Sequence, residues 1–119
     1  MWPKNFKQKE FACKGKACCN GSAPMDGELL RKLQQLRDAL ESPIEITSGF
    51  RCNHHNSHVG GSSRRSYHTL GRACDIKAKG VSVDELAELA KKSFNGVIIY
   101  KSWVHVDIRE SVYYADKRN

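Results

Sequence analysis

Apolar residues recur along this chain at intervals that predict two helices. The first helix should span residues 26–41, because Asp26 is suited to capping a helix N-terminus and Pro43 cannot continue one. The second should begin after Ser82, which is followed by acidic residues in the expected first turn. The apolar faces of these helices consist of Leu29, Leu30, Leu33, Leu36 and Leu40, and of Val83, Leu86, Leu89, Ala90 and Phe94.

Four other segments are rich in β-branched residues or alternate between apolar and polar positions, which predicts strands. They are residues 44–48, 72–77, 97–100 and 103–109. The last two are joined by Lys101-Ser102 and should form a β-hairpin. Helix, strand, loop, strand, helix and hairpin together predict an α+β fold with a small, mostly antiparallel sheet flanked by helices.

The length of 119 residues allows one domain with a single modest core. We expect that domain to span residues 1–119. Residues 1–24 are rich in Lys, Cys and Gly and should form an irregular arm packed on it. Residues 52–67 contain hardly any apolar side chains, and so long a polar loop in a small domain is usually functional.

The charge balance favours an anionic partner. Twenty Lys and Arg against 13 Asp and Glu give a formal net charge of +7, which suits nucleic acid or a bacterial cell wall. A small nucleic-acid binder is disfavoured, because the sequence lacks a basic helix, a zinc-finger spacing and a sheet pattern with interleaved aromatic residues.

Neither a membrane span nor a secretory signal is predicted. No segment is long and apolar enough to cross a bilayer, and no apolar run follows the lysines near the N-terminus. We therefore expect synthesis in the cytoplasm, with outside help needed for any export.

Five cysteines are many for a chain of this length. Cys13, Cys18 and Cys19 crowd together, and they could belong to a disulfide framework, a structural metal site or a set of reduced thiols. A link from this segment to Cys52 is plausible for a protein that works outside the cell. Cys74 should face the core as an inert thiol.

Two separated segments offer the ligands of a catalytic zinc ion, namely His68, Asp75 and His105. Two imidazoles and a carboxylate are a standard three-ligand set that leaves the fourth position to water. Gly71 permits a turn between His68 and the strand that carries Asp75, so that both side chains could face one point.

Strand alternation supports the assignment of His105. In residues 104–109, His105, Asp107 and Arg109 share one face, while the valines and Ile108 share the other. The polar face is either the floor of a cleft or an ordinary solvent-facing surface. Arg51 could clamp a carboxylate or stabilise an oxyanion, or be a plain surface arginine. The remaining histidines of the polar loop are candidates for substrate contact at the cleft rim: His54, His55 and His58.

Three motifs in this order resemble those of the M15 zinc peptidases, which include D-alanyl-D-alanine carboxypeptidases and the L-alanyl-D-glutamate endopeptidases of phage lysins. The motifs are Ser48-Gly49-Phe50-Arg51, Ser66-x-His68-x-x-Gly71-x-Ala73-x-Asp75 and His105-Val106-Asp107. The resemblance spans roughly residues 5–110 and is closest to the short, single-domain branch. It implies zinc held by His68, Asp75 and His105, with Ser66 supporting the ligands and Arg51 near the substrate. It also implies the α+β fold shared with the hedgehog signalling domain.

The chain departs from the family pattern at two positions. Many members carry a Glu or Asp as general base three residues before the last histidine, where this chain has Ser102. Asp107 is the nearest replacement, about 6.6–6.8 Å from His105 along the same strand face, and we predict that it is the base. Tyr67 stands where a glutamine is common.

The resemblance therefore implies a zinc metallopeptidase, either a carboxypeptidase or an endopeptidase, that cleaves the peptide stem of peptidoglycan. Without a signal peptide it would fit an endolysin that acts on the cell wall, in the periplasm or outside the cell, after release. We expect a monomer whose partner is peptidoglycan, with no specific nucleic acid and no membrane. The alternative, suggested by Ser102, is a non-catalytic zinc-bearing module that binds the cell wall.

Overall fold

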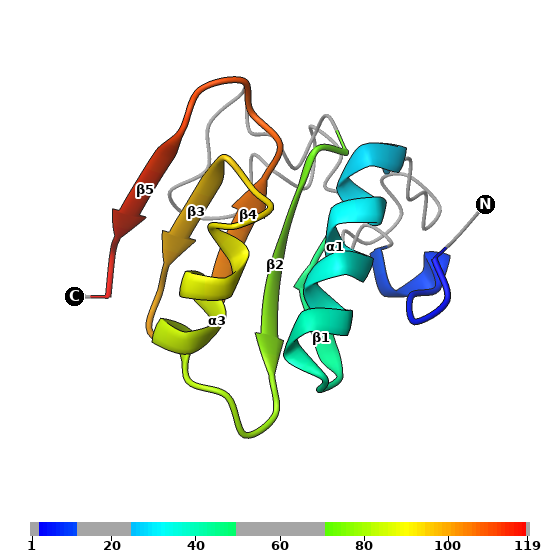
Figure 1. Cartoon of the computed structure of the whole chain (residues 1–119), viewed down its shortest axis with the longest axis horizontal. Helices are drawn as coiled ribbons and strands as arrows, with labels where there is room; N and C mark the ends of the chain where they lie inside the picture. Colours follow the sequence, from blue (N-terminus) through cyan, green and yellow to red (C-terminus); the bar gives the residue numbers. More distant parts are fainter. Residues whose placement is uncertain (1–2, 12–24, 50–70, 119) are drawn as a thin grey trace, which may run out of the picture.

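The computed structural model describes residues 3–11, 25–49 and 71–118. Within these ranges a five-stranded sheet carries two α-helices on one face (Figure 1). The α+β class expected from the sequence is confirmed. The elements in chain order are η1 (Gln8–Phe11), α1 (Gly27–Leu40), β1 (Ile44–Ser48), β2 (Ala73–Ala78), α3 (Val83–Ala90), β3 (Gly96–Ile99), β4 (Val104–Asp107) and β5 (Tyr113–Asp116).

Both helices begin at the predicted capping side chains. Asp26 accepts a hydrogen bond from the backbone N–H of Glu28 at 2.8 Å, and Ser82 accepts one from the backbone N–H of Glu85 at 3.1 Å. The first helix ends at Leu40, and the next residue, Glu41, has a left-handed φ of 54° that turns the chain out of the helix. The helix boundaries therefore follow from local sequence signals.

The sheet has the strand order β1-β2-β4-β3-β5. The first three pairings are antiparallel, as predicted, whereas β5 runs parallel to β3. The hairpin between β3 and β4 is closed by a hydrogen bond from the Tyr100 N–H to the Trp103 carbonyl at 2.9 Å. Strand β5 was not predicted, because its side chains are mostly exposed and show no apolar alternation.

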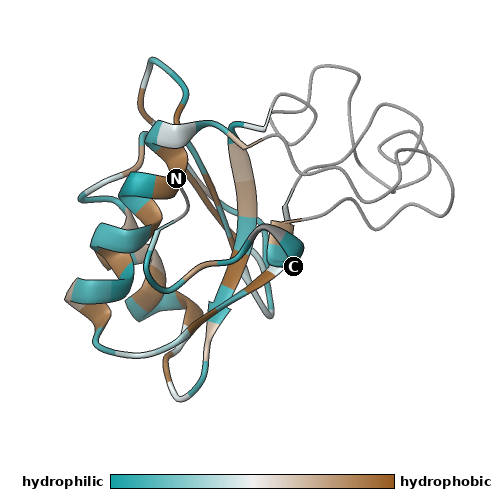
Figure 2. Cartoon of the chain, turned by 90° about the vertical axis from the view of Figure 1, so that its right-hand side faces the viewer, coloured by the Kyte–Doolittle hydropathy of each residue, from teal (hydrophilic) through white to brown (hydrophobic). Residues whose placement is uncertain are grey.

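The hydrophobic core lies between the helices and one face of the sheet, and Figure 2 shows both helices on that side. Phe6 and Phe11 add aromatic rings from the N-terminal segment and are only 2% and 0% exposed. The strands contribute Ile44, Ile46, Cys74, Ile76, Val97, Ile99, Val104 and Val106 to this core. Because side chains alternate along a strand, the residues between these positions point to the other face of the sheet. None of the helices in the described ranges is long and apolar enough to cross a membrane.

Gly49 lies where the backbone of η1 passes closest to the end of β1. A Cβ added at Gly49 would lie 2.6 Å from the Cα of Phe11 and 2.7 Å from its carbonyl oxygen. We expect Gly49→Ala to lower the free energy of unfolding by about 1–3 kcal/mol, because backbone atoms cannot move aside as a flexible side chain can.

The matched control for this prediction is Gly27→Ala. Nothing lies within 4 Å of a Cβ at Gly27, and alanine favours a helix over glycine by up to about 1 kcal/mol. Urea unfolding of both variants measures the difference. Equal stabilities would contradict the close approach at Gly49.

Candidate active site

The face of the sheet opposite the helices carries buried polar side chains from β4. His105 is 9% exposed and Asp107 is 0% exposed, while Val104 and Val106 lie in the hydrophobic core on the other face. The predicted separation of polar and apolar residues along this strand is confirmed. Because both polar side chains are buried, this part of the strand is not an ordinary solvent-facing surface.

The sheet register brings Asp75 to His105. The two residues are Cα partners in the antiparallel pair of β2 and β4, and Asp75 Oδ1 lies 3.1 Å from His105 Nδ1. Just before β2, Gly71 has a φ of 69°, a conformation that suits glycine and agrees with the predicted turn. Cys74 points to the core, where burial raises the pKa of its thiol well above the usual value, as expected for an inert cysteine.

Asp107 holds the other side of the His105 ring, with its Oδ2 2.7 Å from His105 Nε2. Arg109 donates to the same carboxylate from Nε at 2.8 Å, from Nη2 at 2.6 Å and from its backbone N–H at 3.1 Å. Burial raises the pKa of Asp107, but the hydrogen bonds from Arg109 and His105 outweigh it and hold that pKa well below its usual range. The carboxylate is therefore ionised, and both of its oxygens are engaged.

Small residues on both neighbouring strands make room for Asp107. Its Cα partners are Ala73 on β2 and Gly96 on β3. A Cβ added at Gly96 would come much closer to the end of the Asp107 carboxylate than van der Waals contact allows. The carboxylate therefore lies over Gly96, in space that only glycine leaves open.

Both ring nitrogens of His105 face carboxylate oxygens. Burial lowers the pKa of His105, but the hydrogen bonds to Asp107 and Asp75 and the charges of these carboxylates raise it above the usual value. A carboxylate oxygen and a bare ring nitrogen are both acceptors, so the 3.1 Å approach of Asp75 to Nδ1 is favourable only with a positive group between them. That group is either a proton on Nδ1 or a bound cation.

The Asp75 and His105 atoms fit a zinc ion. Carboxylate oxygen and imidazole nitrogen are ordinary zinc ligands, and two such donors on a tetrahedral ion lie about 3.3 Å apart. Among the described residues, no group of three His, Cys, Asp or Glu side chains is placed to hold a metal ion. The third predicted ligand, His68, lies outside the described residues, so its assignment stays a prediction.

Several other predicted residues also lie outside the described ranges. They are Arg51, Ser66, Tyr67, the histidines His54, His55 and His58, and the cysteines Cys13, Cys18, Cys19 and Cys52. Ser102, which occupies the family's usual general-base position, is exposed in the link between β3 and β4. No contact within the described ranges tests the predicted role of Asp107 as general base.

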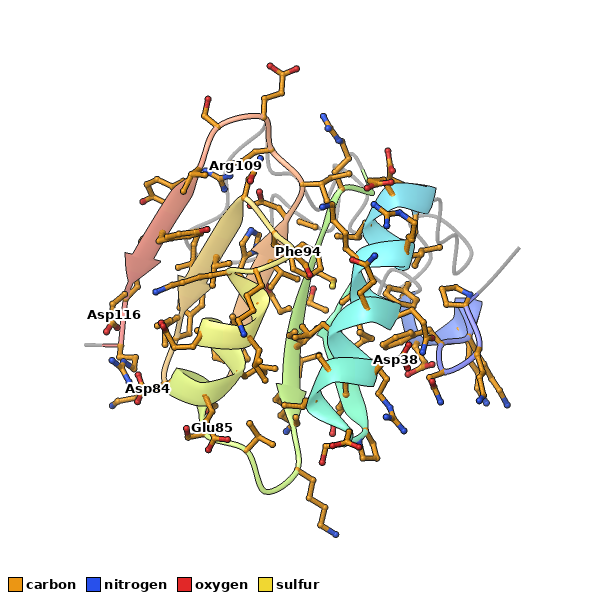
Figure 3. The ribbon with its side chains drawn as sticks, viewed as in Figure 1. Asp38, Asp84, Glu85, Phe94, Arg109 and Asp116 are labelled. Carbon is orange, nitrogen blue, oxygen red and sulfur yellow. The ribbon has the colours of Figure 1, made fainter. Side chains whose placement is uncertain are left out.

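Two residues that contribute to the site, Arg109 and Gly96, were not predicted from the sequence. Strand alternation placed Arg109 on the correct face but gave it no role, although the spacing Asp107-x-Arg109 was a usable signal for an ion pair. Figure 3 shows Arg109 at the end of β4 next to the start of β5, where its guanidinium lies 4.8 Å from the ring centre of Tyr113. Gly96 gave no signal, because its role depends on the strand register.

Comparison with known proteins identifies a family. Residues 4–107 match the family described as Peptidase M15, and a search of curated proteins finds no relative. The matched range runs from η1 to the end of β4 and includes Asp75, His105 and Asp107, whereas Arg109 and β5 lie beyond it. It covers most of the chain and confirms the resemblance that the three sequence motifs indicated. The chain belongs to the M15 peptidase family.

Proposed function

We propose that this protein is a zinc-dependent peptidase that cleaves the peptide stem of bacterial peptidoglycan. Membership of the M15 family supports peptidase activity. The observation that carries the proposed metal site is the approach of Asp75 Oδ1 to His105 Nδ1 at 3.1 Å on a buried polar face. His68 is the proposed third ligand.

The proposed roles follow from the chemistry of the side chains. When bound, zinc supplies Lewis acidity that activates water and polarises a carbonyl group. Arg51 would hold the substrate's carboxylate or the developing oxyanion with its planar guanidinium, and Ser66 would orient a ligand. We leave Asp107 out of the proton transfer, because a buried carboxylate engaged by both Arg109 and His105 is a poor acceptor for a proton from water.

The net charge of +7 supports a substrate in the bacterial wall, because a positive surface raises the local concentration of the enzyme on an anionic matrix. The substrate class is the stem peptide, cut either at its terminal D-alanine or within the stem. The protein would be made in the cytoplasm, act on the wall after release and work as a monomer.

Metal content tests the ligand assignment. We expect purified wild-type protein to carry about one zinc ion per chain and His68→Ala to lose it, because two remaining ligands hold zinc weakly. His58→Ala is the control, since it removes another histidine of the same polar segment. Elemental analysis of the three proteins gives the answer, and equal zinc in all of them would refute the assignment of His68.

Hydrolysis of purified peptidoglycan tests the activity, and mass spectrometry of the released fragments identifies the bond that is cut. The exposed Ser102 at the family's usual base position favours one second candidate, a non-catalytic zinc-bearing wall-binding module. A protein that binds zinc, is retained on peptidoglycan and releases no fragments at any pH would support that module and rule out the peptidase.

A further inference from the structure

We propose that Asp107 is a positioning residue. Clamped by Arg109, it binds Nε2 of the His105 ring and thereby fixes the ring with Nδ1 turned toward Asp75, as a metal ligand requires. The identity of that metal as zinc rests on the proposed function. The positioning itself rests on the contacts that His105 and Asp107 make with β2, β3 and Arg109.

The contact with Asp107 sets the tautomer of the His105 ring. A neutral imidazole has one nitrogen that donates a hydrogen bond and one that accepts. The ionised Asp107 carboxylate can only accept, and its Oδ2 lies 2.7 Å from His105 Nε2. The Asp75 carboxylate also accepts, but its contact with Nδ1 is longer, at 3.1 Å, and Asp107 is in addition fixed by Arg109, so the proton of the neutral ring is held on Nε2. The lone pair stays on Nδ1, the nitrogen that faces Asp75 Oδ1 at 3.1 Å, which is the arrangement a metal ligand needs.

Asp107 is itself held in one orientation by its neighbours. Arg109 donates two side-chain hydrogen bonds and one backbone hydrogen bond to the carboxylate, which fixes its plane. Gly96 and Ala73 on the flanking strands leave space for the carboxylate in this position. The clamp is itself supported, because the Arg109 guanidinium lies over the ring of Tyr113. The carboxylate is thus oriented before any ligand arrives.

A second Asp–Arg ion pair has the same geometry as Asp107 and Arg109 but involves no histidine, and it serves as a control. Arg118 binds Asp116 with the same two-residue spacing and the same pattern, from Nε to Oδ1 at 2.9 Å, from Nη2 to Oδ2 at 2.5 Å and from the backbone N–H at 3.2 Å. Asp116 is exposed, and Arg118 also binds Asp84. In Figure 3, Arg109 and Asp116 lie at opposite ends of β5. A substitution at Asp116 therefore removes the same kind of ion pair away from the site.

The test compares Asp107→Asn with Asp116→Asn. In Asp107→Asn, the amide oxygen should stay at the Oδ1 position, where both the Nε and the backbone N–H of Arg109 donate. The amide nitrogen then replaces Oδ2 and faces His105 Nε2, and the hydrogen bond from Arg109 Nη2 is lost. The amide nitrogen donates, so the neutral ring must move its proton to Nδ1, where it blocks the metal. We expect zinc affinity, measured by competition with a chromophoric chelator, to fall by about 10- to 100-fold. Zinc affinity in Asp116→Asn should match the wild type.

Nitrogen NMR of the imidazole ring gives a second measurement that does not depend on enzyme activity. In the metal-free protein, at a pH where the ring is neutral, His105 should carry its proton on Nε2 in wild type and in Asp116→Asn. It should carry the proton on Nδ1 in Asp107→Asn. The His105 signals are assigned by their loss in His105→Gln. A wild-type proton on Nδ1 would overturn the inference.

The two possible roles of Asp107, general base and positioning residue, lead to different expected results. If Asp107 only accepted a proton during hydrolysis, Asp107→Asn would lose activity but keep the wild-type zinc affinity and tautomer, and this outcome refutes positioning. If Asp107→Asn does not fold, Arg109→Lys is the alternative variant, because lysine cannot make two parallel hydrogen bonds to the carboxylate. Arg109→Lys should also weaken zinc binding. A wild type that binds zinc without cleaving peptidoglycan would refute the proposed function and leave the positioning role in place.

Discussion

Asp75→Asn is expected to abolish peptidoglycan hydrolysis and to reduce bound zinc to background. Asparagine keeps the size of the side chain and can still hydrogen-bond His105, so the fold should remain intact. It removes the only negative charge among the three proposed ligands. Without zinc the attacking water keeps the high pKa of bulk water rather than one of about 7, and we expect the hydrolysis rate to fall by at least about a thousandfold.

The control for Asp75→Asn is Glu45→Gln. Glu45 is an exposed carboxylate on β1 and lies 3.7 Å from Lys77 of β2, on the same strand pair as Asp75. Zinc content, fragment release and thermal unfolding should all match the wild type in this control. One zinc ion per chain together with undiminished hydrolysis in Asp75→Asn would contradict the role given to Asp75.

The local features of the fold could be predicted from the sequence, because their physical causes are local. Capping by Asp26 and Ser82 marks the start of each helix within one residue. Alternation along residues 104–109 correctly put His105 and Asp107 on one face. A positive φ at Gly71 could be predicted because a turn was needed there. In each case the signal and the structure that it predicts lie within a few residues of each other.

The features that the sequence did not reveal depend on contacts between distant segments. The space over Gly96 matters only because β3 and β4 pair in the register that sets it opposite Asp107. Gly49 is required because η1, almost forty residues earlier in the chain, passes over it. The edge strand β5 buries too little apolar surface to leave a pattern, and its parallel pairing with β3 is a long-range event.

Gly96→Ala is expected to lower the free energy of unfolding by about 3 kcal/mol or more. Overpacking alone costs about 1–3 kcal/mol. The added methyl group would also push the buried Asp107 carboxylate away from Arg109 and His105, and breaking buried ion pairs of this kind costs about 3–5 kcal/mol. The backbone itself does not require glycine here, since Gly96 is not among the described residues with positive φ. Urea unfolding measures the loss, and zinc affinity should fall together with stability.

A double-mutant cycle with Asp107→Ala separates this steric effect from a general weakness of strand β3. The Asp107 carboxylate is the nearest group to the added methyl, so removing it removes the clash. In the Asp107→Ala background, Gly96→Ala should then cost almost nothing, or gain up to about 1 kcal/mol because glycine destabilises a strand relative to alanine. The coupling energy should thus be about 3 kcal/mol, at the upper end for residues in direct contact. Additive effects would mean that Gly96 and Asp107 do not share this space, and the preorganised clamp on His105 would lose its structural basis.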